Sequence, residues 1–406
     1  MSRSNDPGHY FQTSDALATS KRKAAKAKNQ HGDPIQLPSK ILAAVPAGAT
    51  NNNNQIYVAE AAGEIHLVDL SSKQTENVFS QGSAPLTCLA VGADGTVYAG
   101  SWDKNVYAID PTGNKTKTKT KAKTLRGHTD FVKCLLITKI SGREILLSGG
   151  ADATIIVWDL SSSSSSSTSG DYKILHKLKV HTQKALQALA IDASATTEDS
   201  ITLFSASSDR EIRRWEISLS TTREIHTDDA LLRPHETSIY RLRWSSENGD
   251  GDDGEDGDLW TASADKTAKR LLRHAHFATS DTTLEHPDFV RDVLPFDALG
   301  LVVTACRDEE VRVWEIASGQ VLCTYSGHYE EVTGLLPTDE GKGVVSVSID
   351  GTVRKWSLLR EEMAQYQERL AREANGEEGI EGAKTEENML TAEEEAELAE
   401  LMEDDD

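Results

Sequence analysis

A histidine, a hydroxyl residue and an aspartate recur together along this chain. Such a set could supply the base, the nucleophile and the orienting acid of a hydrolase. In the clearest copy, His128 precedes Ser148 and Asp152. A catalytic site would need the set once, whereas related sets occur in several segments. The recurrence favours a structural role, in which buried polar groups satisfy one another's hydrogen bonds.

The spacing of these residues is regular. A hydroxyl residue precedes an aspartate by four positions, and a tryptophan follows that aspartate by six. The full frame occurs as Ser148, Asp152, Trp158; Ser205, Asp209, Trp215; Thr304, Asp308, Trp314; and Ser346, Asp350, Trp356. Thr261 and Asp265 repeat it with Leu271 in the tryptophan position, and Asp103 extends it towards the N-terminus. A period of about 40–57 residues is typical of a propeller of four-stranded blades with loop insertions.

The elements that must hold these residues are short hairpins. Around residues 146–159, an apolar run is followed by turn chemistry at 149–152 and by the β-branched and aromatic residues 155–158. This pattern predicts two strands joined by a tight turn. A histidine precedes the hairpins, with a glycine before it in two cases: His128, His181, His235, His286 and His328.

Together with the dipeptide Trp158-Asp159, these motifs resemble the WD-repeat β-propeller family over about residues 34–358. The resemblance implies an all-β fold: a seven-bladed WD-repeat β-propeller, here followed by a C-terminal helix and an acidic tail. It also implies that histidine, hydroxyl, aspartate and tryptophan form a hydrogen-bonded network within each blade. It implies no particular activity, because one fold supports many functions.

Composition divides the chain into four segments, namely a disordered basic arm (1–33), the propeller (34–358), an amphipathic helix (359–375) and an acidic, mostly disordered tail (376–406). Members of the family usually close the ring with an N-terminal strand. Residues 35–37 are expected to complete the seventh blade, which otherwise lacks an outer strand. Six blades with an unrelated first sheet is the alternative, since the first blade lacks the polar frame.

Charge is unevenly distributed. The net charge is −22, and residues 376–406 hold fourteen acids and one lysine. This balance argues against nucleic-acid binding and allows basic protein partners. The basic cluster Lys21, Arg22, Lys23, Lys26 and Lys28 is interpreted as a solvated arm, with a nuclear-import signal or a nucleic-acid patch as alternatives.

The sequence predicts an intracellular protein of the cytoplasm, the nucleus or both, without membrane contact. No signal-peptide pattern opens the chain, and no apolar run approaches the roughly 18 residues of a membrane span. The four cysteines form no C-x-x-C pair and are expected to be buried thiols.

No catalytic, cofactor or metal site is predicted, nor a small-molecule substrate. No cysteine or histidine pair has ligand spacing, and no P-loop occurs. The acidic loop 249–258 lacks the register of a calcium loop.

The two faces of the propeller are expected to differ. Loops after the first and third strands of each blade share one face. The hairpin turns and the links between blades share the other, called the turn face below. The long Ser-, Thr-, Lys- or Asp-rich insertions are assigned to the first face: 115–123, 161–170, 193–200, 218–230, 249–258 and 276–283. The turn face is therefore the predicted binding surface.

Four side chains beside turn aspartates on the turn face are predicted to bind a partner: Trp102, Arg210, Lys266 and Arg307. Tryptophan and arginine dominate binding hot spots. The alternative is that Arg210 and Arg307 pair with the neighbouring acids Glu211 and Glu309.

The predicted function is a non-enzymatic scaffold or adaptor subunit of a multiprotein complex that binds one or more proteins through the turn face. An acidic chaperone or assembly factor for a basic client, ribosomal or chromatin-linked, is a second hypothesis. A third is a non-catalytic accessory subunit of an enzyme such as a ubiquitin ligase. Some family members with that role carry W-D-x-R, whereas residues 158–161 lack the arginine.

Overall fold

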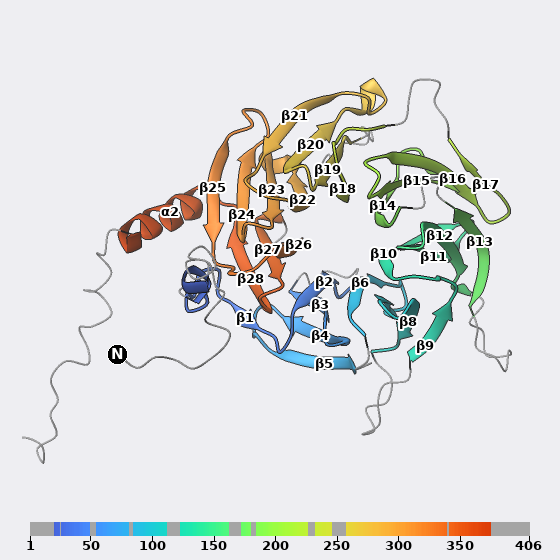
Figure 1. The fold of residues 1–406 in the computed structure, drawn as a ribbon, viewed down its shortest axis with the longest axis horizontal. Helices are drawn as coiled ribbons and strands as arrows, with labels where there is room; N and C mark the ends of the chain where they lie inside the picture. Colours follow the sequence, from blue (N-terminus) through green and yellow to red (C-terminus); the bar gives the residue numbers. More distant parts are fainter. Residues whose placement is uncertain are drawn as a thin grey trace, which may run out of the picture. The chain divides into compact units, whose positions relative to one another are not determined.

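The computed structural model describes residues 20–24, 26–48, 54–80, 84–111, 122–161, 172–179, 184–225, 232–245, 257–338 and 341–374. It divides into two units, Met1–Leu358 and Leu359–Asp406. The first unit consists of seven four-stranded antiparallel sheets arranged as blades around a central channel (Figure 1). The predicted seven-bladed propeller is confirmed, and the first sheet is a blade like the others.

Each blade takes its strands in chain order. Blades one to three are β2 (Ile41–Pro46), β3 (Gln55–Glu60), β4 (Glu64–Asp69) and β5 (Thr75–Ser80); β6 (Leu86–Val91), β7 (Val97–Ser101), β8 (Asn105–Ile109) and β9 (Ala122–Arg126); and β10 (Val132–Ile140), β11 (Arg143–Gly150), β12 (Thr154–Asp159) and β13 (Lys173–Lys179). Blades four and five are β14 (Leu186–Asp192), β15 (Ser200–Ser207), β16 (Ile212–Ser218) and β17 (Thr222–Glu224); and β18 (Ile239–Trp244), β19 (Leu259–Ser263), β20 (Thr267–Leu271) and β21 (Ser280–Glu285). Blade six is β22 (Val290–Phe296), β23 (Leu301–Cys306), β24 (Glu310–Glu315) and β25 (Val321–Ser326).

The core lies between neighbouring blades. Every residue of β7 and β12 is buried, while β13 on the outer rim is mostly exposed or half-buried. One apolar cluster joins Leu147 and Val157 of blade three to Leu203 and Trp215 of blade four. A strand that is buried on both faces needs an almost continuous apolar sequence. This requirement explains the apolar residues on both sides of each hairpin turn.

The N-terminal strand closes the ring. Blade seven consists of β26 (Val332–Thr338), β27 (Gly343–Ser348), β28 (Thr352–Ser357) and β1 (Ile35–Gln36). Ile35 pairs antiparallel with Val353, and the Leu37 N–H donates to the Gly351 carbonyl at 2.8 Å. The sequence predicts this pairing. It covers the edge of β28 and leaves a strand of only two residues as the outer edge of the blade, and short edge strands resist aggregation.

The predicted disordered arm differs from the structure between residues 20 and 33. Residues 20–24 are helical, and residues 26–33 lead into β1. Arg22 contacts Glu309 at 2.8 Å, and Lys26 contacts Glu310 at 2.6 Å. The interpretation of these basic residues as a solvated cluster is therefore wrong for Lys26, whose side chain is 18% exposed, whereas Arg22 forms its ion pair while 57% exposed. Their acidic partners lie nearly three hundred residues away in sequence, so local composition could not reveal them.

One insertion was assigned to the wrong face in part. Residues 218–230 were expected to form a single loop, but β17 occupies Thr222–Glu224 and pairs with β16. Residues 225 and 232–238, the described residues between β17 and β18, therefore belong to the link from blade four to blade five, on the turn face. In this link Leu232 makes an isolated bridge with Ile212.

The second unit contains α2 (Arg360–Ala374), within one residue of the predicted helix at each end. Glu368 and Arg372, four positions apart, lie 3.9 Å from each other. The predicted acidic tail lies outside the described residues. No helix in the described ranges is long and apolar enough to cross a membrane.

Candidate partner-binding face and the networks beneath it

The complete polar network forms in blade three. Trp158 Nε1–H donates to Ser148 Oγ at 2.8 Å, and His128 Nε2 lies 2.8 Å from the same oxygen. His128 Nδ1 lies 3.1 Å from Asp152. Blade seven repeats this arrangement with contacts of 2.7–2.9 Å among His328, Ser346, Asp350 and Trp356.

These networks have the geometry of structural groups. Burial raises the pKa of Asp152, but hydrogen bonds from His128, Thr129 and Thr154 outweigh it and hold that pKa well below the ordinary value. Ser148 is fully buried, so its hydroxyl is inaccessible to a substrate. Its hydrogen bonds with the tryptophan and the histidine tie three separate segments together.

Blade five keeps part of the network. His235 lies 2.8 Å from Asp265 and 2.7 Å from the Thr261 hydroxyl. With Leu271 in the tryptophan position, no indole N–H faces that hydroxyl, and Thr261 donates instead to the carbonyl of Lys269 at 3.2 Å.

Blade six keeps the same residue types but changes their partners. His286 Nε2 and Trp314 Nε1 both lie 2.8 Å from Thr304 Oγ1. Asp308, however, accepts from Arg312 at 2.6 Å, and His286 Nδ1 contacts the Leu284 carbonyl. Burial, and next the nearby Arg312, lower the pKa of His286 to about 4. The structure thus does not bring Asp308 to its histidine.

Blade four retains Ser205 and Trp215, whose indole donates to the hydroxyl at 2.8 Å. Asp209 accepts from Ser207 and lies 3.9 Å from Arg213. The expected partner histidine, His181, lies outside the described residues.

The cysteines Cys88, Cys134, Cys306 and Cys323 are all buried and free. Burial raises the pKa of Cys88 and of Cys306 to about 12, and that of Cys323 to about 11. Such thiols are poor nucleophiles at neutral pH, as expected of core residues.

Each hairpin turn presents one residue in the left-handed region. Lys104, Arg210 and Lys266 have φ of 76°, 65° and 70°, one position after the turn aspartate. The same position is Gly63, Ala153, Glu309 and Gly351 in the other blades. A non-glycine residue in this conformation is uncommon, so the hairpin contacts must hold it there. Arg210 and Lys266 are exposed at these turns.

The arginines on the turn face have partners other than those anticipated. Arg210 lies 3.7 Å from Glu236, while Arg307 stacks over the Phe289 ring at 5.1 Å. Glu211 instead contacts Arg213 and Arg233, and Glu309 contacts Arg22 and Lys26. The arginines therefore do not pair with Glu211 and Glu309, but each has another acid beside it: Glu236 for Arg210, and Asp288, at 4.0 Å, for Arg307.

Trp102 belongs to an exposed aromatic pair. Its ring stacks on Phe131 with centroids 5.1 Å apart and planes 17° from parallel. The two side chains are 44% and 37% exposed. Phe131 precedes β10 and so comes from the neighbouring blade, which is why the sequence frame missed it.

Further aromatic and basic groups surround the central channel. Arg291 stacks over Tyr240 at 4.3 Å. A cavity of about 430 Å³ in the ring is lined by these two residues and by Trp102, Lys133 and Arg241, among others. Aromatic and basic groups at the starts of first strands, next to the links, give the turn face a mixed chemistry suited to protein partners. Lys133, Tyr240, Phe289 and Arg291 were not anticipated, because they fall outside the repeated frame.

Comparisons with known proteins agree with this architecture. The family model "WD domain, G-beta repeat" matches residues 119–159 and 319–357. An uncharacterized WD repeat-containing protein of Schizosaccharomyces pombe is 34% identical over 413 residues, covering 99% of this chain and 100% of that protein. The chain therefore belongs to the family of WD-repeat proteins.

Other relatives match in part. Nuclear distribution protein PAC1 of Arthroderma benhamiae is 26% identical over 59% of this chain and 52% of its own length. Pre-mRNA-processing factor 19 of Bos taurus is 25% identical over 47% of this chain and 32% of that protein. The crystal structure of the WD40 β-propeller domain of Doa1 has a TM-score of 0.62 at 17% identity, covering 82% of this chain and 98% of that one. At this identity it supports the fold alone.

Proposed function

We propose that this WD-repeat propeller is a non-enzymatic scaffold or adaptor subunit of a multiprotein complex. The observation that carries the proposal is the exposed Trp102–Phe131 stack on the turn face. A rigid aromatic pair offers a large contact area at little cost in conformational entropy, and such residues are enriched in binding hot spots. The protein binds its partners there, in the cytoplasm, the nucleus or both.

The surroundings of the stack support this assignment. Arg307 and Arg291 lie over aromatic rings and pair with Asp288 and Glu331, and their side chains remain 50% and 31% exposed. Arg210 and Lys266 project from other turns. The hydroxyls of the polar networks are buried and serve the fold, so they do not argue for an enzyme.

The experiment compares full-length protein with Trp102→Ala and Arg307→Ala in affinity purification followed by mass spectrometry. Leu299→Ala is the matched control, because this leucine is 37% exposed but lies between β22 and β23, on the opposite face. The same proteins should be lost from both turn-face variants and kept by the control. Retention in all three variants, with unchanged melting temperatures, would contradict the proposal.

A second candidate, an assembly factor for a basic client, is favoured by one contact. The chain's own residues Lys26 and Arg22 occupy an acidic site formed by Glu309 and Glu310 on blade six. Burial raises the pKa of Glu310, an effect that Lys26 opposes, so this carboxylate favours a cation beside it. A basic segment of another protein would meet the same chemistry by displacing residues 20–26.

A lysine-rich peptide tests this candidate. Its binding should weaken in Glu310→Gln and as salt rises, because screening reduces attraction between exposed charges. Glu236→Gln is the control, since that side chain is 87% exposed and lies on another blade. Equal binding by both variants would reject the candidate.

A further inference from the structure

Blade one departs from the other blades at the position that ends its second strand. That position pairs with the first residue of the blade's first strand, and in blades two to seven it holds a small residue: Ser101, Gly150, Ser207, Ser263, Cys306 and Ser348. In blade one it holds Glu60, which pairs with Ile41. Blade one therefore has a long acidic side chain at the position where the other six blades have serine, glycine or cysteine.

The space for this side chain exists because blade one lacks the polar network. In blade three, a Cβ on Gly150 would lie 2.5 Å from both Asp152 and His128. Blade one has Ala62 in the aspartate position and Leu37 four residues before its first strand, where blades three, five, six and seven have histidine. The carboxylate of Glu60 therefore points towards the region that a histidine–aspartate pair fills elsewhere.

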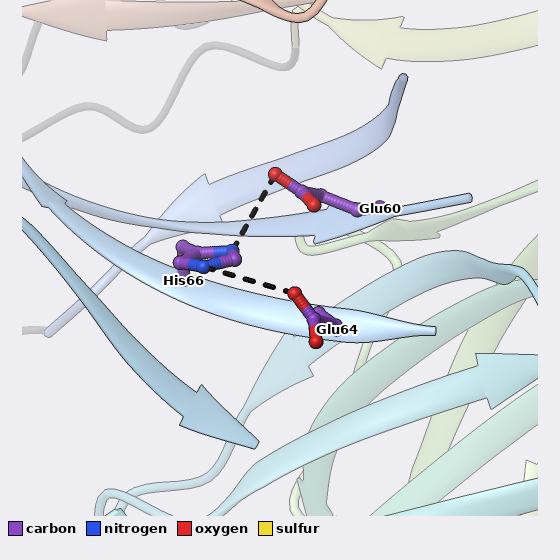
Figure 2. A group of neighbouring side chains, drawn as sticks. All are labelled: Glu60, Glu64 and His66. Atoms are coloured by element: carbon purple, nitrogen blue, oxygen red, sulfur yellow. Dashed lines mark ion pairs between the residues drawn. The ribbon is translucent and has the colours of Figure 1, made fainter. Parts of the chain in front are cut away.

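The groups around Glu60 are two further metal-ligand types, His66 and Glu64 of β4 (Figure 2). Figure 2 shows the imidazole ring between the two carboxylates. His66 Nδ1 lies 3.4 Å from Glu60 Oε1, and Nε2 lies 4.0 Å from Glu64 Oε2. Both distances exceed the 2.7–3.2 Å range typical of hydrogen bonds.

Glu60 and His66 are buried, and among the described residues the one contact of the Glu60 carboxylate is its long ion pair of 3.4 Å with His66. Glu60 is fully buried, and neither of its carboxylate oxygens has a hydrogen-bond partner among the residues that the structure describes. The same holds for His66 Nδ1. An unpaired buried carboxylate is costly, so a buried charge normally pairs with another charge or coordinates a metal. The cluster therefore needs a positive charge beside Glu60.

We propose that Glu60, Glu64 and His66 form a binding site for a zinc ion. One ligand atom from each residue lies within 4.8 Å of the others. Two ligands on a tetrahedral zinc ion are separated by about 3.3 Å, given bonds of about 2.0–2.1 Å, which matches the 3.4 Å between Glu60 Oε1 and His66 Nδ1. Glu64 lies 4.0 Å from the other ring nitrogen, Nε2, so its partly exposed side chain must turn towards Nδ1 to complete the site. Three protein ligands leave the fourth position to water or to a partner's side chain.

The donor set selects the metal. Imidazole suits zinc, whereas calcium and magnesium prefer sites made of oxygen alone. Ser80 donates to Glu64 Oε1 at 3.1 Å, which orients that carboxylate and leaves Oε2 facing the histidine. Glu64 is 28% exposed and forms the open edge of the site, through which an ion would enter.

Zinc binding to metal-free full-length protein would be measured by calorimetry, with excess magnesium present to occupy weak carboxylate sites such as those of the acidic tail. One zinc per chain should bind, and zinc should raise the melting temperature because it binds the folded state. Glu64→Gln should lower the zinc affinity more than about 10-fold while the buried Glu60–His66 pair stays intact. Glu60→Gln should abolish it.

Glu236→Gln is the control, because it removes one exposed carboxylate elsewhere and should leave zinc affinity unchanged. The alternative arrangement is a simple ion pair between Glu60 and a protonated His66. It predicts no one-to-one zinc event in the wild-type protein. Either that result or equal zinc affinity in wild type and Glu64→Gln would overturn the proposal.

Discussion

Individual side chains decide how each blade is held. Asp152 in blade three accepts from a histidine, two threonines and the backbone. Asp308 in blade six has the same place in the sequence frame but accepts from Arg312. The frame therefore predicts which residues meet near the turn but not which partner the aspartate takes. Asp350 in blade seven also has an arginine four positions further on, Arg354, yet it contacts His328.

Loss of Asp152 should destabilise the protein. Asp152→Ala removes the acceptor of buried His128, so we expect a loss of about 1–3 kcal/mol in the free energy of unfolding. Urea titration of wild type and variant measures the difference. Asp94→Ala is the control, because Asp94 is an exposed turn aspartate that accepts hydrogen bonds from Thr96 of its own turn in blade two. Equal losses in the two variants would show that the network adds no stability.

Acid should weaken the fold through His286. Its pKa is lowered to about 4 from an ordinary value of 6.5, so between these pH values the unfolded chain binds more protons than the folded one. Stability therefore falls as the pH falls through this window, by roughly 1–3 kcal/mol from this residue. His286→Asn should flatten the dependence of unfolding free energy on pH. His274→Asn, at an exposed histidine, should leave it unchanged.

At the scale of elements, the N-terminal segment does more than add a strand. Asn29 accepts from Arg354 at 2.8 Å, and the Lys355 N–H donates to the Gly32 carbonyl. Gly32 has φ of 69°, and a Cβ there would lie 2.6 Å from the Trp356 ring. The residues that precede β1 in the sequence therefore also pack against β28.

Two deletions separate these contributions. Deletion through Gln30 removes the ion pairs to Glu309 and Glu310 and the Asn29 contact, so we expect a moderate fall in melting temperature. Deletion through Ser39 also removes β1 and opens the ring, so the fall should be much larger. Calorimetric melting compares the two chains. Equal melting temperatures would show that β1 does not close the ring in solution.

The elements were predictable from sequence to different extents. Blades three and seven follow from the frame itself, because every network member is present. β1 follows from a short apolar run and the missing outer strand of blade seven. The helix at residues 20–24 could not be predicted from the sequence, because its partners on blades six and seven become its neighbours only after the ring forms. The Trp102–Phe131 stack escaped notice for the same reason, since it joins two blades.

At the scale of the whole molecule, the charge of residues 376–406 should act over distance. If a basic partner binds the turn face, a chain ending at Asn375 should associate with it more slowly at low salt and at an equal rate at high salt. Stopped-flow mixing measures both rates. Melting temperature should change little, because this composition has too few apolar groups to offset ordering. A rate unaffected at low salt would exclude electrostatic steering by the tail.

Ring closure must wait until the last strands of the propeller have been synthesised. The residues that pair in blade seven lie more than 300 positions apart, as Gln36 and Asp350 illustrate. A ribosome adding 5–20 residues per second needs roughly 15–60 s to make that length. For that interval β1 has been synthesised without its partner strand, and blade one has a neighbour on one side only. A slow codon run or a stalled ribosome late in the message would prolong exposure of these apolar edges, which makes the nascent propeller a natural client of chaperones.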